Sequence, residues 1–196
     1  MLVTSDHGEE FGEHGAIGHS HALHAEVLNI PMSLFFPPIA PPGHSIETPV
    51  SLVDVLPTLL DILELPSMES DGRSLRPLLE GNDFGEPRAI YAQNFSEKGS
   101  QWAARTSSHK FIFEGEDLNP VAVYDLRFDP GEQDSLDDEE LAREGRQWVQ
   151  IYKDLVIENM TAATERDAAS RSDGATEPAA VDADLANKLR ALGYAD

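Results

Sequence analysis

The sequence predicts an α/β protein in which the end of a parallel sheet is followed by a small antiparallel sheet packed with a long helix. A short β-prone segment at residues 2–4 leads into a loop rich in histidine, glutamate and glycine, as at the carboxyl end of a buried strand. Several short strand patterns follow between residues 89 and 126, as in an antiparallel sheet. An amphipathic pattern over residues 137–164 predicts a helix that covers this sheet.

Composition narrows the classes of function. A chain of 196 residues is long enough to bury a core, but it carries 36 acidic and only 14 basic residues. This balance argues against a nucleic-acid groove, which needs clustered Lys and Arg. The absence of cysteine excludes disulfides, thiolate metal sites and a cysteine nucleophile. No apolar run is long enough to predict a membrane span. No signal-peptide pattern is present, and the localisation stays open.

Four elements are expected after the opening loop. Residues 21–28 predict a short helix and residues 30–36 a buried strand. The prolines of segment 37–43 predict a rigid connector, because proline fits neither a helix interior nor a central strand. Residues 51–65 carry an apolar stripe at helical spacing, which we expect to pack in the core, with Pro57 bending or delimiting the helix.

The second half begins with a loop and a short helix over residues 71–81. The expected strands are 89–93, 101–106, 110–114 and 121–126. The helix of residues 137–164 presents apolar side chains that are able to lie on their sheet: Leu141, Trp148, Ile151, Tyr152 and Leu155. Residues 165–181, rich in small and polar side chains, predict a flexible linker, and residues 182–192 a final helix.

The opening segment holds the strongest functional signal. Five of the seven histidines lie between His7 and His24, interleaved with glutamates and glycines, so oxygen and imidazole donors can converge on a cation. Ligands bind at the carboxyl ends of strands in open α/β sheets, where the loops diverge. Asp6 and His7 can reach one metal only if the backbone turns sharply, and Gly8 permits such a turn. Asp6 and His7 are therefore the candidate metal ligands.

These residues resemble the metal-binding segment of the sulfatases, which belong to the alkaline phosphatase superfamily. The matching residues are Thr4-Ser5-Asp6-His7-Gly8-Glu9-Glu10-Phe11-Gly12-Glu13-His14-Gly15 and Gly18-His19-Ser20, followed in the family's order by Ser51-Leu52-Val53-Asp54-Val55-Leu56-Pro57-Thr58-Leu59-Leu60-Asp61, Asp71-Gly72-Arg73-Ser74-Leu75, Arg105-Thr106 with Lys110-Phe111, Tyr124-Asp125-Leu126, Asp129-Pro130-Gly131-Glu132 and Leu189-Arg190-Ala191-Leu192-Gly193-Tyr194. The resemblance covers nearly the whole chain, but only the carboxyl-terminal portion of the family's pattern. It implies an alkaline-phosphatase-like parallel sheet at residues 1–88, an antiparallel subdomain at 89–164, and a linker with a terminal helix at 165–196.

The resemblance also implies roles for three residues. Asp6 and His7 would supply two ligands of an active-site divalent metal, most often calcium in this family. Calcium prefers hard oxygen donors, so the imidazole leaves manganese possible. His19 matches a position whose basic side chain reaches the sulfate group, which makes it the candidate substrate-binding and catalytic residue. The substrate class implied is a small-molecule or glycan sulfate ester.

Other polar residues of the segment are expected to play lesser parts. His14, His21 and His24 are expected at the surface or in support of the ligands, although the spacing His19-x-His21-x-x-His24 could bind adventitious metal. Glu9, Glu10 and Glu13 are expected to be solvated loop carboxylates. Lys110 and residues 124–126 are expected to be structural, at the rim of the substrate cleft.

The family's nucleophile is absent from this sequence. Sulfatases attack sulfur with a formylglycine made in a Cys/Ser-x-Pro-x-Arg segment, and no proline of this chain has Ser two residues before it and Arg two after it. The paired aspartates of the family's metal site also lie upstream of the matched region. We therefore expect an incomplete sulfatase whose partner is the missing amino-terminal half, and which is inactive alone.

Two alternatives remain open from the sequence. Phosphodiesterases and phosphonate monoester hydrolases of the same superfamily share the metal-binding segment. A fragment that binds metal or a partner without turnover would carry the same residues.

Overall fold

The computed structural model describes residues 1–19, 21–40, 43–85, 88–96 and 99–172. The chain divides into two compact units, residues 1–153 and residues 154–196. The described part of the first unit mixes short helices with three small sheets, in agreement with the predicted α/β class. Of the second unit, the described part is the carboxyl-terminal portion of the long helix α4 (Glu139–Ser172). Among the described helices, none is sufficiently long and apolar to cross a bilayer.

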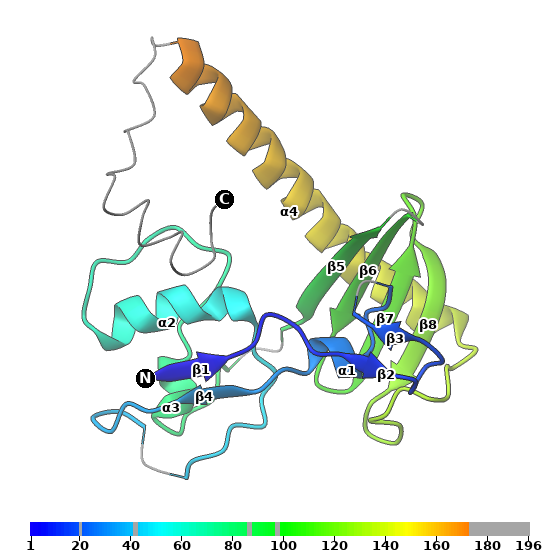
Figure 1. Cartoon of the computed structure of the whole chain (residues 1–196), viewed down its shortest axis with the longest axis horizontal. Helices are drawn as coiled ribbons and strands as arrows, with labels where there is room; N and C mark the ends of the chain where they lie inside the picture. Colours follow the sequence, from blue (N-terminus) through cyan, green and yellow to red (C-terminus); the bar gives the residue numbers. More distant parts are fainter. Residues whose placement is uncertain (20, 41–42, 86–87, 97–98, 173–196) are drawn as a thin grey trace. The chain divides into compact units, whose positions relative to one another are not determined.

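The predicted antiparallel sheet is confirmed. Its strands are β5 (Ile90–Ser96), β6 (Gly99–Arg105), β7 (His109–Glu114) and β8 (Asn119–Asp125). They are joined in sequence order as a meander, β5-β6-β7-β8, and each neighbouring pair is antiparallel. In Figure 1 this sheet is drawn in green, with α4 beginning behind it.

Both faces of this sheet are covered, because alternate side chains of a strand point to opposite faces. On one face, Phe111 and Phe113 of β7 pack in a buried cluster with Val149 of α4. On the other face, Ile112 packs with Leu23 from the amino-terminal segment and Tyr124 from β8. The sheet therefore serves as the floor on which the histidine-rich segment rests.

Helix α4 differs from expectation in register and length. Val149 is the α4 side chain that is fully buried against the sheet, whereas Ile151, which was expected to lie on the sheet, is 60% exposed. Gly145 sets the close approach, since a Cβ there would overlap the Phe111 ring. The helix continues to Ser172, so residues 165–172 are helical where a linker was expected; the Glu, Arg and Ala residues of this stretch have high helix propensity. Residues 173–196, with the rest of the expected linker and the terminal helix, lie outside the described part.

The amino-terminal strands are exposed, not buried as predicted. β1 (Leu2–Thr4) pairs antiparallel with β4 (Met32–Leu34), and no parallel pair occurs among the described strands. Val3 is 54% exposed because this ribbon has two strands only. A hairpin of β2 (Glu10–Phe11) and β3 (Ile17–Gly18) and the one-turn helix α1 (Ala25–Leu28) follow β1 in the chain.

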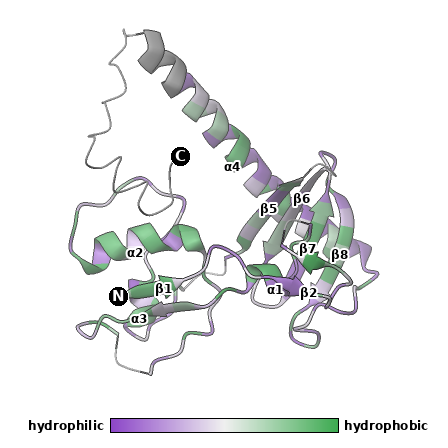
Figure 2. Ribbon diagram, viewed as in Figure 1, coloured by the Kyte–Doolittle hydropathy of each residue, from purple (hydrophilic) through white to green (hydrophobic). Residues whose placement is uncertain are grey.

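Residues 51–62 form a short 3₁₀ turn, η1 (Leu52–Asp54), continued by α2 (Val55–Ile62). Pro57 lies in the first turn of α2, where its missing N–H is tolerated. A second one-turn helix, α3 (Arg76–Leu79), follows in the chain. The prediction that the apolar stripe packs in the core is wrong for this chain, since Val53 and Leu56 are about half exposed. Figure 2 shows the apolar character of α2.

A buried carboxylate holds η1 and α2 in place instead. Asp54 is fully buried and accepts two hydrogen bonds from the Arg88 guanidinium, at 2.9 and 2.8 Å. The backbone N–H groups of Ser51 and Arg73 donate to the same carboxylate at 2.9 and 3.0 Å. Gly72 is required beside it, because a Cβ would overlap the Val53 carbonyl. Polar contacts thus replace apolar packing at this end of the first unit.

Candidate metal and anion site

The predicted ligand pair lies at the end of β1. The Asp6 side chain is 87% exposed, and its Oδ2 is 3.9 Å from Nε2 of His7. The Nδ1 atom of His7 lies 2.8 Å from the Gly8 carbonyl, which can only accept a hydrogen bond. Nδ1 therefore donates to this carbonyl, and Nε2 is the ring nitrogen that lies nearest the Asp6 carboxylate. Hydrogen bonds from the Asp6 and His7 backbone N–H groups lower the pKa of the Asp6 carboxyl.

His19 lies beside His7, as required if both serve one site. The two rings stack with centroids 3.8 Å apart and an interplanar angle of 23°. Nδ1 of His19 is 3.1 Å from a Glu9 carboxylate oxygen. The hairpin register explains this contact: Glu10 pairs with Gly18, so Glu9 and His19 follow as cross-strand neighbours. All three predicted site residues, Asp6, His7 and His19, thus belong to one partly exposed cluster.

Gly8 is needed for a reason that differs from the predicted turn. A Cβ at this position would overlap the Glu26 carbonyl of α1, and no left-handed backbone angle is involved. The Gly8 N–H also donates to the Val27 carbonyl at 2.8 Å. Gly8 therefore lets the loop that carries Asp6 and His7, the ligand loop, lie directly against α1.

Glu10 is not the solvated carboxylate that was expected, because it is fully buried. One of its oxygens accepts hydrogen bonds from the backbone N–H groups of His14 and Ala16, both at 3.0 Å. The other oxygen lies 3.3 Å from Nε2 of His21. These hydrogen bonds, that from Ala16 first, lower the pKa of Glu10. Glu10 fixes the hairpin from inside, whereas Glu13 is exposed as expected.

His14 and His24 form the base of the segment. Their rings stack at 3.7 Å with an interplanar angle of 8°. His14 donates from Nε2 to the Glu132 carbonyl at 2.8 Å, and Nε2 of His24 lies 3.4 Å from the Tyr124 hydroxyl. Burial lowers the pKa of His24 to about 4, with His14 and Lys110 adding to the effect, so this imidazole is neutral at pH 7.

A buried ion pair joins the segment to the sheet. Nζ of Lys110 on β7 donates to both Glu132 oxygens, at 2.9 and 2.7 Å, and both side chains are almost fully buried. The same carboxylate accepts the backbone N–H of Ala25 at 3.0 Å, at the start of α1. Desolvation lowers the pKa of Lys110, and the charge of Glu132 opposes that effect. Lys110 is thus structural.

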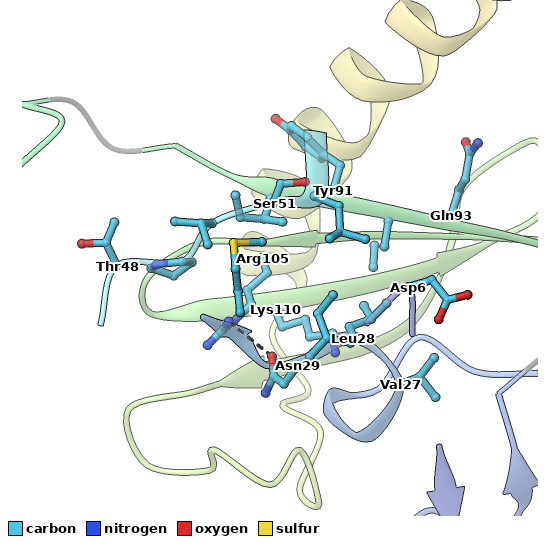
Figure 3. Close-up of a pocket in the computed structure, with 18 of the residues that line it drawn as sticks. Asp6, Val27, Leu28, Asn29, Thr48, Ser51, Tyr91, Gln93, Arg105 and Lys110 are labelled. Atoms are coloured by element: carbon cyan, nitrogen blue, oxygen red, sulfur yellow. Dashed lines mark hydrogen bonds between the residues drawn. The ribbon is translucent and has the colours of Figure 1, made fainter. Parts of the chain in front are cut away.

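A pocket of about 820 Å³ opens beside Asp6. Its polar lining includes Asp6, Asn29, Tyr91 and Arg105, and Lys110 also borders it. In Figure 3, Asp6 lies on the opposite side of the pocket from Thr48, and a hydrogen bond of 3.4 Å joins Arg105 to Asn29. The space is large enough for a sugar-sized ligand.

Sequence reasoning located the exposed donors but missed the buried supports. Glu132 gave no signal of its own beyond its place in the Asp129-Pro130-Gly131-Glu132 match, and its carboxylate is 2% exposed. It adopts a positive φ of 56° in the turn that follows β8.

The three groups His7, Glu9 and His19 each offer a ligand atom within 4.8 Å of the others. The set suits a divalent cation chemically, since it combines imidazole and carboxylate donors.

Comparison with known proteins places the chain among sulfatases. Residues 12–156 match the family model described as N-sulphoglucosamine sulphohydrolase, C-terminal. The chain is 29% identical over 165 residues to arylsulfatase K of Danio rerio, which covers 79% of this chain and 29% of that protein. It is 28% identical over 147 residues to the N-acetylglucosamine-6-O-sulfatase of Bacteroides thetaiotaomicron, covering 69% of this chain and 26% of that protein. The chain thus spans less than a third of these relatives.

Solved structures share the fold. The structure of BT4656 in complex with its substrate D-glucosamine-2-N,6-O-disulfate is 24% identical, with a TM-score of 0.61, covering 79% of this chain and 33% of that one. The phosphonate monoester hydrolase of Agrobacterium radiobacter is 23% identical, also with a TM-score of 0.61, covering 82% of this chain and 34% of that one.

Proposed function

The chain belongs to the sulfatase family, as its match to the N-sulphoglucosamine sulphohydrolase C-terminal model establishes, and we propose that it is the metal- and anion-binding portion of a sulfate ester hydrolase. One observation carries this proposal. Asp6 and His7 present a carboxylate oxygen and an imidazole nitrogen on one exposed side, 3.9 Å apart, with His19 stacked against His7.

We assign Asp6 and His7 to a divalent metal ion, with calcium and manganese as the candidates. Asp6 supplies a hard oxygen donor, and His7 supplies Nε2 because its Nδ1–H is held by the Gly8 carbonyl. Two donors are too few to fix a catalytic ion, so the remaining ligands come from outside these residues. When bound, such an ion would polarise a sulfuryl oxygen and stabilise the charge that develops there.

We assign His19 to the anion. Its ring lies against His7, and Glu9 at 3.1 Å from Nδ1 orients it. An imidazole N–H beside the metal can donate a hydrogen bond to a sulfate ester oxygen. The relatives that act on sulfated glucosamines motivate a sulfated sugar as the substrate class, and the pocket beside Asp6 has the size to take one.

We propose that the nucleophile comes from an amino-terminal portion like that of the relatives, which extend well beyond the matched region. The exposed apolar residues of η1 and α2 support this proposal, because Leu52, Val53 and Leu56 form a surface that such a portion would cover. The absence of a Cys/Ser-x-Pro-x-Arg segment from this chain points the same way.

A chimera tests the proposal. The chain is joined to the amino-terminal portion of the Bacteroides N-acetylglucosamine-6-O-sulfatase, and release of sulfate from 4-nitrophenyl sulfate and glucosamine 6-sulfate is measured. We expect turnover by the chimera, none by the chain alone, and a loss of about 100-fold or more in kcat with Asp6→Asn or His19→Ala. Turnover by the isolated chain, or full activity of both variants, would overturn the assignment.

The same chimera addresses the second enzyme class. A phosphonate monoester hydrolase shares the fold, and its substrates present a similar oxyanion. We expect hydrolysis of the sulfate ester to exceed that of phenyl phenylphosphonate. The reverse preference would reassign the chain to the phosphonate hydrolases.

A further inference from the structure

Three side chains of the loop form a donor set that differs from the Asp6–His7 pair. His7, Glu9 and His19 each offer one ligand atom, and these atoms all lie within 4.8 Å of one another. Their side chains are 41%, 39% and 47% exposed, so a hydrated ion can reach them directly. Asp6 is not a member of this set.

The local backbone holds these donors close together. Glu9 immediately precedes β2 and His19 immediately follows β3, and the pairing of Glu10 with Gly18 places Glu9 and His19 opposite each other. His7 reaches them from the bend before the hairpin, and its ring stacks on His19. Buried Glu10 holds the hairpin together through hydrogen bonds to its backbone. Glu9 and His19 are therefore held opposite each other before any ion binds.

The chemistry of the donors selects the ion. Two imidazoles and one carboxylate are the ligands of a three-residue zinc site that keeps an open position, whereas calcium takes six to eight oxygens. The rings are stacked at an angle of 23°, and because both are partly exposed, each side chain has room to turn out of the stack so that its ligand nitrogen faces the ion.

We infer that His7, Glu9 and His19 bind a borderline divalent cation, Zn²⁺ above all, at a site that shares only His7 with the Asp6–His7 pair. Binding at this site does not depend on the proposed function. A consequence does: zinc would take His7 from the hydrolase metal and His19 from the anion, so it would inhibit the assembled enzyme.

The inference is tested by titrating the purified 196-residue chain with ZnCl₂ in an isothermal titration calorimeter. We expect saturable binding of one ion, weakened about tenfold or more by Glu9→Gln and by His19→Asn. Asp6→Asn should change the dissociation constant less than threefold. Circular dichroism of each variant verifies that the fold is retained.

Matched histidine variants control for adventitious binding. His21→Asn tests the spacing His19-x-His21, and His44→Asn removes a histidine remote in sequence; neither should weaken binding. The inference is overturned if Asp6→Asn weakens binding as much as Glu9→Gln, if His21→Asn abolishes it, or if the wild-type chain shows no saturable binding. Zinc inhibition of an active chimera, measured in each variant against its own metal-free activity and weakened in Glu9→Gln, would show the consequence separately.

Discussion

The histidine-rich segment holds two interleaved sets of residues, an exposed set and a buried set, that use the same residue types for opposite purposes. Asp6, His7 and His19 are exposed and leave ligand atoms open to solvent. Glu10 is buried and His14 and His24 are largely so, with hydrogen bonds to backbone or to the sheet. The difference teaches that the number of histidines and carboxylates does not define a site here; solvent access to their lone pairs does.

Removal of the buried anchor is expected to have the largest effect. Glu132→Gln would leave Lys110 buried without its charge partner, which costs about 3–5 kcal/mol of unfolding free energy. Glu116→Gln is the matched control, because Glu116 is 80% exposed in its pair with Lys153, and the expected loss is about 0.5 kcal/mol. Urea denaturation measures both. Equal losses would remove the distinction between the two pairs.

The pH dependence of stability isolates His24. Its pKa is about 4 in the folded protein against 6.5 as the ordinary value, so the unfolded chain binds more protons between these pH values. Stability therefore falls as the pH drops from about 6.5 towards 4, and because His24 is only partly buried and solvent screens the effect, this group contributes less than the roughly 3 kcal/mol that the full shift implies. His24→Phe keeps a stacking ring and should remove that part of the slope in urea titrations at several pH values. An unchanged slope would mean that His24 is not buried as a neutral group.

The contact between the ligand loop and α1 can be broken at one atom. Gly8→Ala places a methyl group against the Glu26 carbonyl and should cost about 1–3 kcal/mol. Gly131→Ala is the control, since its Cβ would meet only Gln133 at an ordinary 3.8 Å and should change stability by less than about 0.5 kcal/mol. Thermal melts compare them. A neutral Gly8→Ala would show that the loop does not need α1.

Substitutions in the exposed set should leave the free energy of unfolding nearly unchanged. Glu9→Gln keeps the shape of the side chain and removes a charge that is 39% exposed, so the midpoint of urea denaturation should not change measurably without metal. With excess ZnCl₂, the wild type should gain stability by mass action and the variant should gain less. A clear loss of stability without metal would assign Glu9 to the scaffold.

Sequence patterns predicted what is periodic or locally encoded. The four strands of the meander are short β-prone runs separated by turns, and the opening donors lie beside a strand end, so both could be found from residue order. Burial of single polar residues could not be. Glu9 and Glu10 are adjacent and alike in sequence, yet the hairpin directs one to solvent and the other inward.

The exposed stripe of α2 shows the other limit of sequence reasoning. Apolar spacing predicted a packed helix but could not tell which surface would cover Val53 and Leu56. Within the described residues, the buried Asp54–Arg88 pair holds this region, through contacts more than thirty residues apart in the chain. Long-range polar pairs of this kind leave no periodic signal.

The distinction between the exposed set and the buried set is tested most directly by NMR. The imidazole ¹⁵N shifts of all histidines are measured while the labelled chain is titrated with ZnCl₂. Coordination to zinc moves the shift of the bound nitrogen, so each ring reports for itself. We predict that His7 and His19 respond while His14 and His24 keep their shifts, because their lone pairs and N–H groups face the protein interior. A response of His14 or His24, with His7 unchanged, would contradict the account.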